Sequence, residues 1–284
     1  LYNVLQVTCD PGDEVIIISP YWLSYPEMVT LAGAKSVFVQ TDEKKGFRAA
    51  VQDIKRAISE KTRAIVINSP SNPAGVIYSR QELSEIADIC VSKGIVVISD
   101  EIYEKLVYDG REHVSIASLG REIYDTTVTV NGVSKSYAMT GWRIGYIAAP
   151  EPVAKAVSTL QSHSTSNPAS ISQCAAVAAL NMGEAVITGM REAFEKKRDL
   201  MSSLLDGVRP ITYVKPAGAF YVFCNIEKTG LKASDFASKL LDEKLVAVVP
   251  GESFGSAGHI RLSFATSEDN IKKGMERLKS WVGQ

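Results

Sequence analysis

The 284-residue sequence predicts an α/β fold with two unequal parts: a mostly parallel sheet with helices on both faces, and a smaller α+β domain at the C-terminal end. Three observations support this prediction. Short apolar runs alternate with helical patterns up to Pro150, and each run is continuous, as expected for strands buried on both faces. After Pro150 the pattern becomes helical before short strands return. The hydrophobic content of 45% is enough for a sizeable core.

The part before Pro150 supplies the strands of the predicted sheet. An amphipathic helix from Leu1 ends at the turn 10–13, which precedes the first strand. Strands are predicted at residues 14–19, 36–40, 64–68, 95–98 and 126–130. Helices are predicted at residues 25–32, 51–59 and 79–94. The last of these begins with a Ser79–Glu82 capping box and ends at Gly94.

The part after Pro150 begins with helices. They are predicted at residues 151–161, 169–181 and 183–205, and the third is long and amphipathic, which suits a bridge between domains. Beyond it, strands at 212–214, 219–225, 246–249 and 259–265 alternate with helices at 234–243 and 268–282. We therefore expect a large domain at residues 1–182, and a linking helix with a small domain at residues 183–284.

Chemically capable side chains stand at or just after the ends of several predicted strands. Trp22, Asn72, Asp100 and Lys135 each lie in such a position. Because parallel strands end on the same side of a sheet, these four residues should face one crevice, where open α/β sheets bind ligands. A lone tryptophan is more often part of the core, and an aspartate often caps a turn, so the convergence carries the prediction rather than any single residue.

Lys135 lies in a stretch that is poor in charge. The 25 residues from Thr126 to Pro150 contain only two charged side chains, Lys135 and Arg143, in a chain that is 22% charged. Enclosure by apolar and hydroxyl neighbours disfavours the ammonium form of a lysine, and the neutral amine is a nucleophile. The ordinary alternative is that Lys135 reaches solvent and Arg143 pairs with a carboxylate.

The same stretch resembles a family signature. Ser134-Lys135-Ser136, followed by Met139 to Tyr146, is similar to the motif of class I aminotransferases, which are pyridoxal-phosphate enzymes of fold type I. The resemblance implies that Lys135 holds pyridoxal 5'-phosphate as a Schiff base and that Arg143 clasps the phosphate, with Ser134 as a further phosphate ligand. A site of this kind would take a small-molecule amino acid and a 2-oxo acid.

The resemblance also assigns roles at the other strand ends. Asp100 corresponds to the residue that pairs with the pyridine nitrogen and keeps it protonated. Asn72 and Tyr103 match residues that hydrogen-bond the cofactor's phenolate oxygen. Trp22 corresponds to the ring that stacks on the cofactor, and both Trp22 and Asn72 border the substrate. Gly132 departs from the family pattern, because many members have a phosphate-binding serine there.

Arg261 is the substrate-binding candidate in the small domain. Alternation along residues 259–265 places Arg261 on the small, polar face of its strand, opposite three apolar residues. That face could simply be a solvated edge. In the family, the matching arginine binds the substrate α-carboxylate as a bidentate fork.

The resemblance implies an aspartate aminotransferase-like enzyme that uses 2-oxoglutarate by a ping-pong mechanism. Aromatic or prephenate aminotransferases share these motifs, and so do lyases of the same fold, such as C–S lyases and aminocyclopropane carboxylate synthases. A non-catalytic ligand-sensing domain would need an attached basic helix-turn-helix, which the sequence does not contain. Family members have further residues before the point that matches Leu1, so we expect an N-terminally truncated chain that is a homodimer when complete.

Composition argues against other classes. A net charge of −1 gives no electrostatic basis for binding nucleic acid or a membrane surface. The four cysteines lie far apart and are expected to be reduced thiols, which suggests a cytoplasmic protein. No histidine pair has zinc-ligand spacing, so a catalytic metal is not expected. The absence of GxSxG, SxxK and GxGxxG argues against hydrolase and dinucleotide-binding folds.

Overall fold

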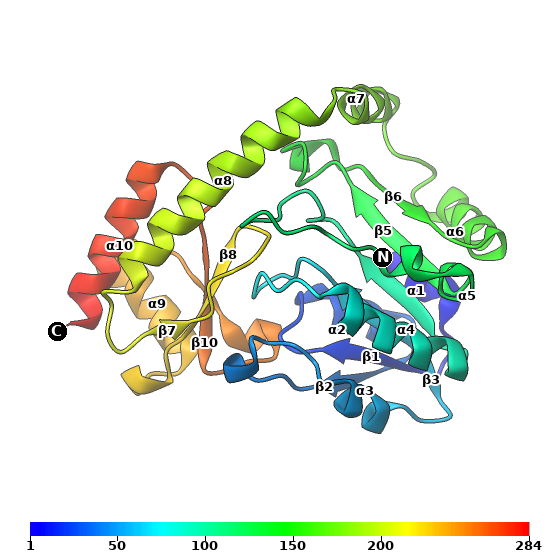
Figure 1. Ribbon diagram of the computed structural model, residues 1–284, viewed down its shortest axis with the longest axis horizontal. Helices are drawn as coiled ribbons and strands as arrows, with labels where there is room; N and C mark the ends of the chain where they lie inside the picture. The colour runs from blue at the N-terminus through cyan, green and yellow to red at the C-terminus, as the bar shows by residue number, and fades with distance from the viewer. Residues whose placement is uncertain (284) are drawn as a thin grey trace.

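The computed structural model describes residues 1–283 and contains the predicted larger sheet (Figure 1). Its six strands lie in the order β2-β1-β3-β4-β5-β6. All neighbouring pairs are parallel except β5 and β6, which are antiparallel. The strands are β1 (Glu14–Ile18), β2 (Lys35–Val39), β3 (Thr62–Asn68), β4 (Val96–Asp100), β5 (Thr127–Gly132) and β6 (Gly145–Ala148).

Helices cover both faces of this sheet because alternate strand residues enter two different cores. Ile16 packs on one face with residues of α3 and α4, whereas its neighbours Val15 and Ile17 pack on the other with residues of α1 and α2. The strands are thus apolar on both sides, which explains their continuous apolar runs. The helices are α1 (Tyr2–Thr8), α2 (Ser24–Leu31), α3 (Val51–Ala57), α4 (Arg80–Lys93), α5 (Arg121–Tyr124), α6 (Glu151–Ser164) and α7 (Ser170–Leu180).

The long helix α8 (Glu184–Leu205) leads from α7 to a second, smaller sheet (Figure 1). This sheet is antiparallel, with strand order β7-β8-β10-β9, and its core packs against α8, α9 and α10. Its elements are β7 (Thr212–Tyr213), β8 (Tyr221–Asn225), α9 (Ala233–Lys244), β9 (Val249–Pro250), β10 (His259–Ser263) and α10 (Glu268–Val282). The fold class predicted from the sequence is confirmed, while the exact domain boundary at residue 183 stays a prediction.

A buried arginine fastens α8 to the rest of the molecule. The side chain of Arg198 is fully buried and donates to both carboxylate oxygens of Asp109, at 2.8 and 2.7 Å. It also donates to the carbonyl of Pro216 and stacks over the ring of Tyr108. Since Asp109 belongs to the loop after β4, this cluster fixes the small sheet relative to the large one.

Several predicted boundaries need correction. The strand β5 does not break at Asn131 but continues to Gly132, which pairs with Gly145 of β6. Neither β6 nor the short helix α5 was predicted. The predicted strand at residues 246–249 is wrong, because only Val249 and Pro250 pair with β10. Within residues 1–283 no single helix has the length and hydropathy of a membrane span; α7 and α8 together reach them only as a pair bent by 88°.

Candidate active site

A cavity of about 590 Å³ lies between the carboxyl ends of the parallel strands and the small sheet. All eight site residues predicted from the sequence line it: Trp22, Asn72, Asp100, Tyr103, Ser134, Lys135, Arg143 and Arg261. Seven of them come from the large sheet and its loops, and Arg261 comes from β10. The structure therefore brings together the whole predicted set, while the role of each residue stays a prediction.

The ends of β3 and β4 are held together by an asparagine. Asn68, the last residue of β3, is in register with Asp100, the last residue of β4. Its side-chain amide donates to the Asp100 carbonyl at 2.9 Å, and its side-chain oxygen accepts from the Asn72 backbone N–H at 2.9 Å. This bridge places the loop that carries Asn72 beside Asp100, although Asp100 lies in the strand and not after it.

Asp100 is a buried carboxylate that is bonded by neutral donors. Its side chain is only 4% exposed. Tyr25 donates its hydroxyl to Oδ2 at 2.6 Å, and the backbone N–H of Ile102 donates to Oδ1 at 3.3 Å. Burial raises the pKa of Asp100, although the hydrogen bond from Tyr25 opposes this shift. The geometry leaves the carboxylate facing the cavity with its negative charge poorly compensated.

Lys135 follows β5 in a loop and is half-buried, as the charge-poor sequence indicated. Its Nζ lies 5.9 Å from the ring centroid of Tyr103 and 5.5 Å from that of Phe220. Burial lowers the pKa of Lys135, and the positive charges of Arg143 and Arg261 lower it further. At a given pH, a larger fraction of Lys135 is therefore in the neutral amine form than for an exposed lysine. The neutral amine is the form that a nucleophile or a base requires.

Arg261 presents a guanidinium group that has no carboxylate partner among residues 1–283. Its Nη1 donates to Asn72 Oδ1 at 2.8 Å, and its Nε is buried without a hydrogen-bond partner. The group lies 4.3 Å from the ring centroid of Tyr221 and 4.9 Å from that of Phe254. Two aromatic rings thus hold the arginine in place and leave donors available to a ligand in the cavity.

The predicted phosphate ligands lie beyond β5. Arg143 is exposed, has a left-handed backbone (φ 54°) and donates to the carbonyl of Thr140 at 2.7 Å. Ser134 is half-buried beside Lys135. At Gly132 an added Cβ would lie 2.9 Å from the Ile144 carbonyl oxygen, so the backbone here is too close for the serine that the resemblance led us to expect.

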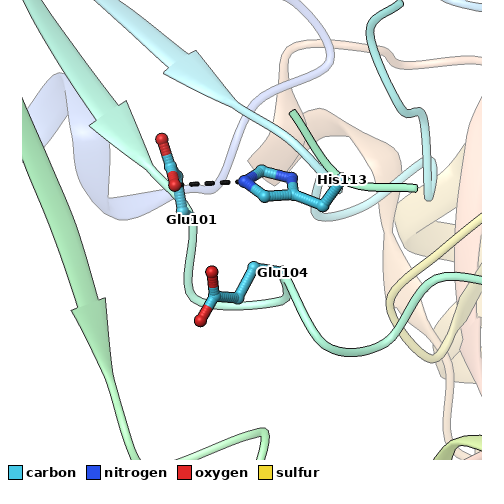
Figure 2. A group of neighbouring side chains, drawn as sticks. All are labelled: Glu101, Glu104 and His113. Carbon is cyan, nitrogen blue, oxygen red and sulfur yellow. Dashed lines mark hydrogen bonds and ion pairs between the residues drawn. The ribbon is translucent and has the colours of Figure 1, made fainter. Parts of the chain in front are cut away.

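A second polar cluster lies directly after the end of β4 and contains Glu101, Glu104 and His113 (Figure 2). The buried carboxylate of Glu101 accepts from His113 at 3.0 Å, from Ser115 at 2.7 Å and from Ser99 at 2.8 Å. Glu104 lies close by, so the fold creates a group of potential metal ligands that the sequence spacing did not suggest. Both oxygens of Glu101 already accept hydrogen bonds. We therefore interpret this cluster as structural: it fixes Glu101 and thereby the backbone next to Asp100.

Sequence reasoning missed two tyrosines of the site. Tyr25 contacts Asp100 from α2, and Tyr221 reaches the hydroxyl of Tyr103 from the start of β8. Tyr25 lies three residues after Trp22, and this closeness in the sequence was the only available signal for it. Tyr221 had none, because its contact spans 118 residues.

Comparison with known proteins agrees with this geometry. Residues 1–278 match the family model described as aminotransferase class I and II. The chain is 50% identical to the aspartate aminotransferase of Bacillus subtilis, over 99% of the chain and 73% of that protein. It is 44% identical to the aspartate/prephenate aminotransferase of Thermus thermophilus, over 100% of the chain and 73% of that protein.

Solved structures show the same similarity. The Thermus thermophilus aspartate aminotransferase with maleate superposes with a TM-score of 0.94 at 43% identity, over 98% of this chain and 72% of that one. The aromatic aminotransferase of Pyrococcus horikoshii gives a TM-score of 0.94 at 39% identity, over 99% of this chain and 76% of that one. The chain therefore belongs to the class I and II aminotransferases and is an aminotransferase of fold type I.

Proposed function

We propose that the chain transaminates L-aspartate with 2-oxoglutarate, with pyridoxal 5'-phosphate bound in the cavity. The observation that carries this proposal is the set of groups that share the cavity: a lysine with a lowered pKa, a buried carboxylate and an arginine without a carboxylate partner. These three groups are the nucleophile, the ring-nitrogen partner and the carboxylate clamp that the reaction requires.

The residues present fit the cofactor. Asp100 is a buried carboxylate that forms no ion pair with a lysine or arginine side chain among residues 1–283, so a protonated ring nitrogen would relieve its burial cost. Asn72 uses its oxygen for Arg261, which leaves its amide NH₂ to donate to the phenolate oxygen together with Tyr103. Arg143 and Ser134 would bind the phosphate.

The chemistry divides among the side chains. When bound, pyridoxal phosphate supplies an electron-withdrawing ring that stabilises negative charge at the substrate Cα. Asp100 keeps the ring nitrogen protonated. Lys135 would remove the proton from the substrate Cα with its neutral Nζ, and its lowered pKa favours that form. Arg261 would hold the α-carboxylate, and Trp22 lines the cavity.

The choice of aspartate follows the names of the relatives, several of which are aspartate aminotransferases. Others are named aspartate/prephenate aminotransferases, and one solved relative is an aromatic aminotransferase. Prephenate or an aromatic amino acid is therefore the second candidate substrate. It would use the same lysine, carboxylate and arginine and differ only in the contacts to the substrate side chain.

We also propose that the enzyme acts as a homodimer. Five large apolar side chains of α7, the turn after it and the start of α8 are exposed. The side chains concerned are Ile171, Val177, Leu180, Met182 and Val186. Exposed apolar surface of this kind is typical of a protein interface, and in a two-fold dimer the same surface would meet its own copy. Sedimentation of the protein and of an Ile171→Glu variant tests this: the variant should dissociate.

Half-reactions with single amino acids test the proposed function. The cofactor-loaded protein is mixed with each amino acid in turn, and the visible absorbance of the cofactor is followed. Aspartate and glutamate should convert the spectrum, and 2-oxoglutarate should restore it. Fastest conversion by phenylalanine or tyrosine would favour the second candidate. No conversion by any amino acid, or release of ammonia in place of amino transfer, would overturn the proposal.

A further inference from the structure

Tyr221 joins the two sides of the cavity. It is 7% exposed, lines the cavity and begins β8. Its hydroxyl lies 3.0 Å from the hydroxyl of Tyr103, and its ring lies under the guanidinium of Arg261 at 4.3 Å. We propose that Tyr221 is a positioning residue with two separable parts: the hydroxyl aligns Tyr103 toward the cofactor, and the ring aligns Arg261 toward the substrate carboxylate. This inference rests on the proposed function.

The register of the small sheet produces this arrangement. Tyr221 of β8 pairs with Ser263 of β10 in an antiparallel ladder, so Arg261, two residues away, is its diagonal neighbour on the same face. The intervening Leu262 and the facing Val222 point into the core on the other side. The ring of Tyr221 is therefore placed beneath Arg261 by strand pairing, which is rigid, and not by a loop.

The hydrogen bond between the two hydroxyls has a defined donor, Tyr221, once Tyr103 donates to a ligand. Burial raises the pKa of Tyr103 well above its usual value, and the neighbouring Tyr221 raises it further, so Tyr103 remains a neutral phenol. A phenol has a single hydrogen. If Tyr103 donates that hydrogen to the cofactor's phenolate oxygen, its own oxygen is free to accept the hydrogen of Tyr221. Such a chain of hydrogen bonds orients Tyr103 and strengthens its donation.

The ring contact restricts Arg261. The guanidinium contacts the rings of Tyr221 and Phe254, and its one side-chain hydrogen bond within residues 1–283 goes to Asn72. Stacking on an aromatic face stabilises a guanidinium that is removed from water. Without the ring of Tyr221, Arg261 would keep its charge but lose one of the two surfaces that fix its orientation.

Two variants separate the parts, and a third is the control. Tyr221→Phe removes the hydroxyl and keeps the ring, whereas Tyr221→Leu removes both. Tyr213→Phe removes a hydroxyl that donates to Ser202 and Asp206, in the same small domain but outside the cavity. For each protein three quantities are measured: the apparent Kd for pyridoxal phosphate, from quenching of tryptophan fluorescence in the cofactor-free protein; the Kd for maleate in the cofactor-loaded protein, by calorimetry; and the thermal midpoint.

We expect Tyr221→Phe to weaken pyridoxal phosphate about 2- to 10-fold, the range for one hydrogen bond, and to leave the Kd for maleate within about 2-fold. Tyr221→Leu should weaken maleate by a further 3- to 30-fold or so, the range for a lost cation–π contact. Tyr213→Phe should change neither Kd. Unchanged cofactor affinity in Tyr221→Phe would overturn the role of the hydroxyl, and equal maleate affinity in the two Tyr221 variants would overturn that of the ring. Parallel weakening of both ligands in Tyr221→Phe, in step with the thermal midpoint, would reduce Tyr221 to a structural residue.

If the unaltered protein binds no pyridoxal phosphate, the proposed function fails, and this inference, which rests on it, fails with it. If it binds the cofactor and transaminates while the variants behave as the control does, only the inference fails.

Discussion

The two walls of the cavity differ in how completely their polar groups are paired. On the large-sheet wall, both oxygens of Asp100 accept hydrogen bonds, and Asn68 joins the strand ends. On the small-sheet wall, Arg261 keeps a buried Nε without a partner and meets no carboxylate within residues 1–283. The difference indicates that the fold itself hydrogen-bonds both oxygens of Asp100 and leaves only their charge to be balanced by a cofactor, whereas Arg261 gains a carboxylate partner only when a ligand binds.

Replacing Lys135 should have the largest effect of any substitution on the large-sheet wall. Replacing it with alanine removes both the amine that holds the cofactor and the base that moves the Cα proton, so turnover should fall by at least about 10²- to 10⁴-fold, the range for one general base. Steady-state kinetics with aspartate and 2-oxoglutarate measures this loss. Lys155→Ala, which removes an exposed partner of Glu151, is the control and should keep full activity. Multiple turnovers at a comparable rate in Lys135→Ala would exclude Lys135 from the chemistry.

Substitutions of Arg261 test whether the small-sheet wall binds the substrate carboxylate. Arg261→Ala should weaken every amino acid and maleate alike by about 2–5 kcal/mol, the cost of breaking a buried charge pair. Arg261→Lys should restore only part of this loss, because lysine lacks the planar fork and the stacking surface. Cofactor absorbance should be unchanged in both variants. Maleate binding that is as tight in Arg261→Ala as in the unaltered protein would place the carboxylate elsewhere.

Tyr25 tests whether the carboxylate on the large-sheet wall depends on its donor. Tyr25→Phe removes the hydrogen bond to Asp100 Oδ2, so the free energy of unfolding of the cofactor-free protein at neutral pH should fall by about 1.5–3 kcal/mol, the range for bonds to charged groups. Denaturant unfolding measures this. Tyr78→Phe, which removes a long 3.5 Å contact to the Ala49 N–H, is the matched control and should cost less. Equal losses in the two variants would show that Asp100 does not depend on Tyr25.

The smallest effect concerns the charge on Lys135. Its pKa is lowered in the folded protein by burial and by two arginines, so the charged lysine disfavours folding below that pKa. As pH rises above the folded pKa, the folded state releases the proton before the unfolded state does, and the stability of the unaltered protein increases. Lys135→Met should therefore raise the thermal midpoint of the cofactor-free protein near neutral pH, and the gain should shrink toward pH 10. A gain that grows with pH would contradict the lowered pKa.

The elements that sequence analysis placed well have strong local signals. The helix α4 begins with the predicted capping box, in which Ser79 and Glu82 bond each other's backbone N–H, and ends at the left-handed Gly94. The cavity residues at the strand ends were predictable because parallel strands end on the same side. Both predictions need only the hydrophobic periodicity of the sequence and the order of the predicted helices and strands.

The features that were missed depend on contacts between distant residues. Tyr25 is 75 residues from Asp100, and Tyr221 is 118 residues from Tyr103, so no local pattern marks either. The strand β6 is four residues long and is defined by its pairing with β5. The run after Leu245 has the composition of a strand, but only its last residue, Val249, pairs with β10.

The role of Lys135 is tested most directly by mapping the site at which the cofactor is covalently attached. The protein loaded with pyridoxal phosphate is reduced with borohydride, digested, and its peptides are mapped by mass spectrometry. We expect the reduced cofactor on the peptide that contains Lys135, and no labelled peptide from Lys135→Ala. Label on another lysine in the unaltered protein, or no stable label at all, would contradict the assignment of Lys135 and with it the proposed chemistry of the cavity.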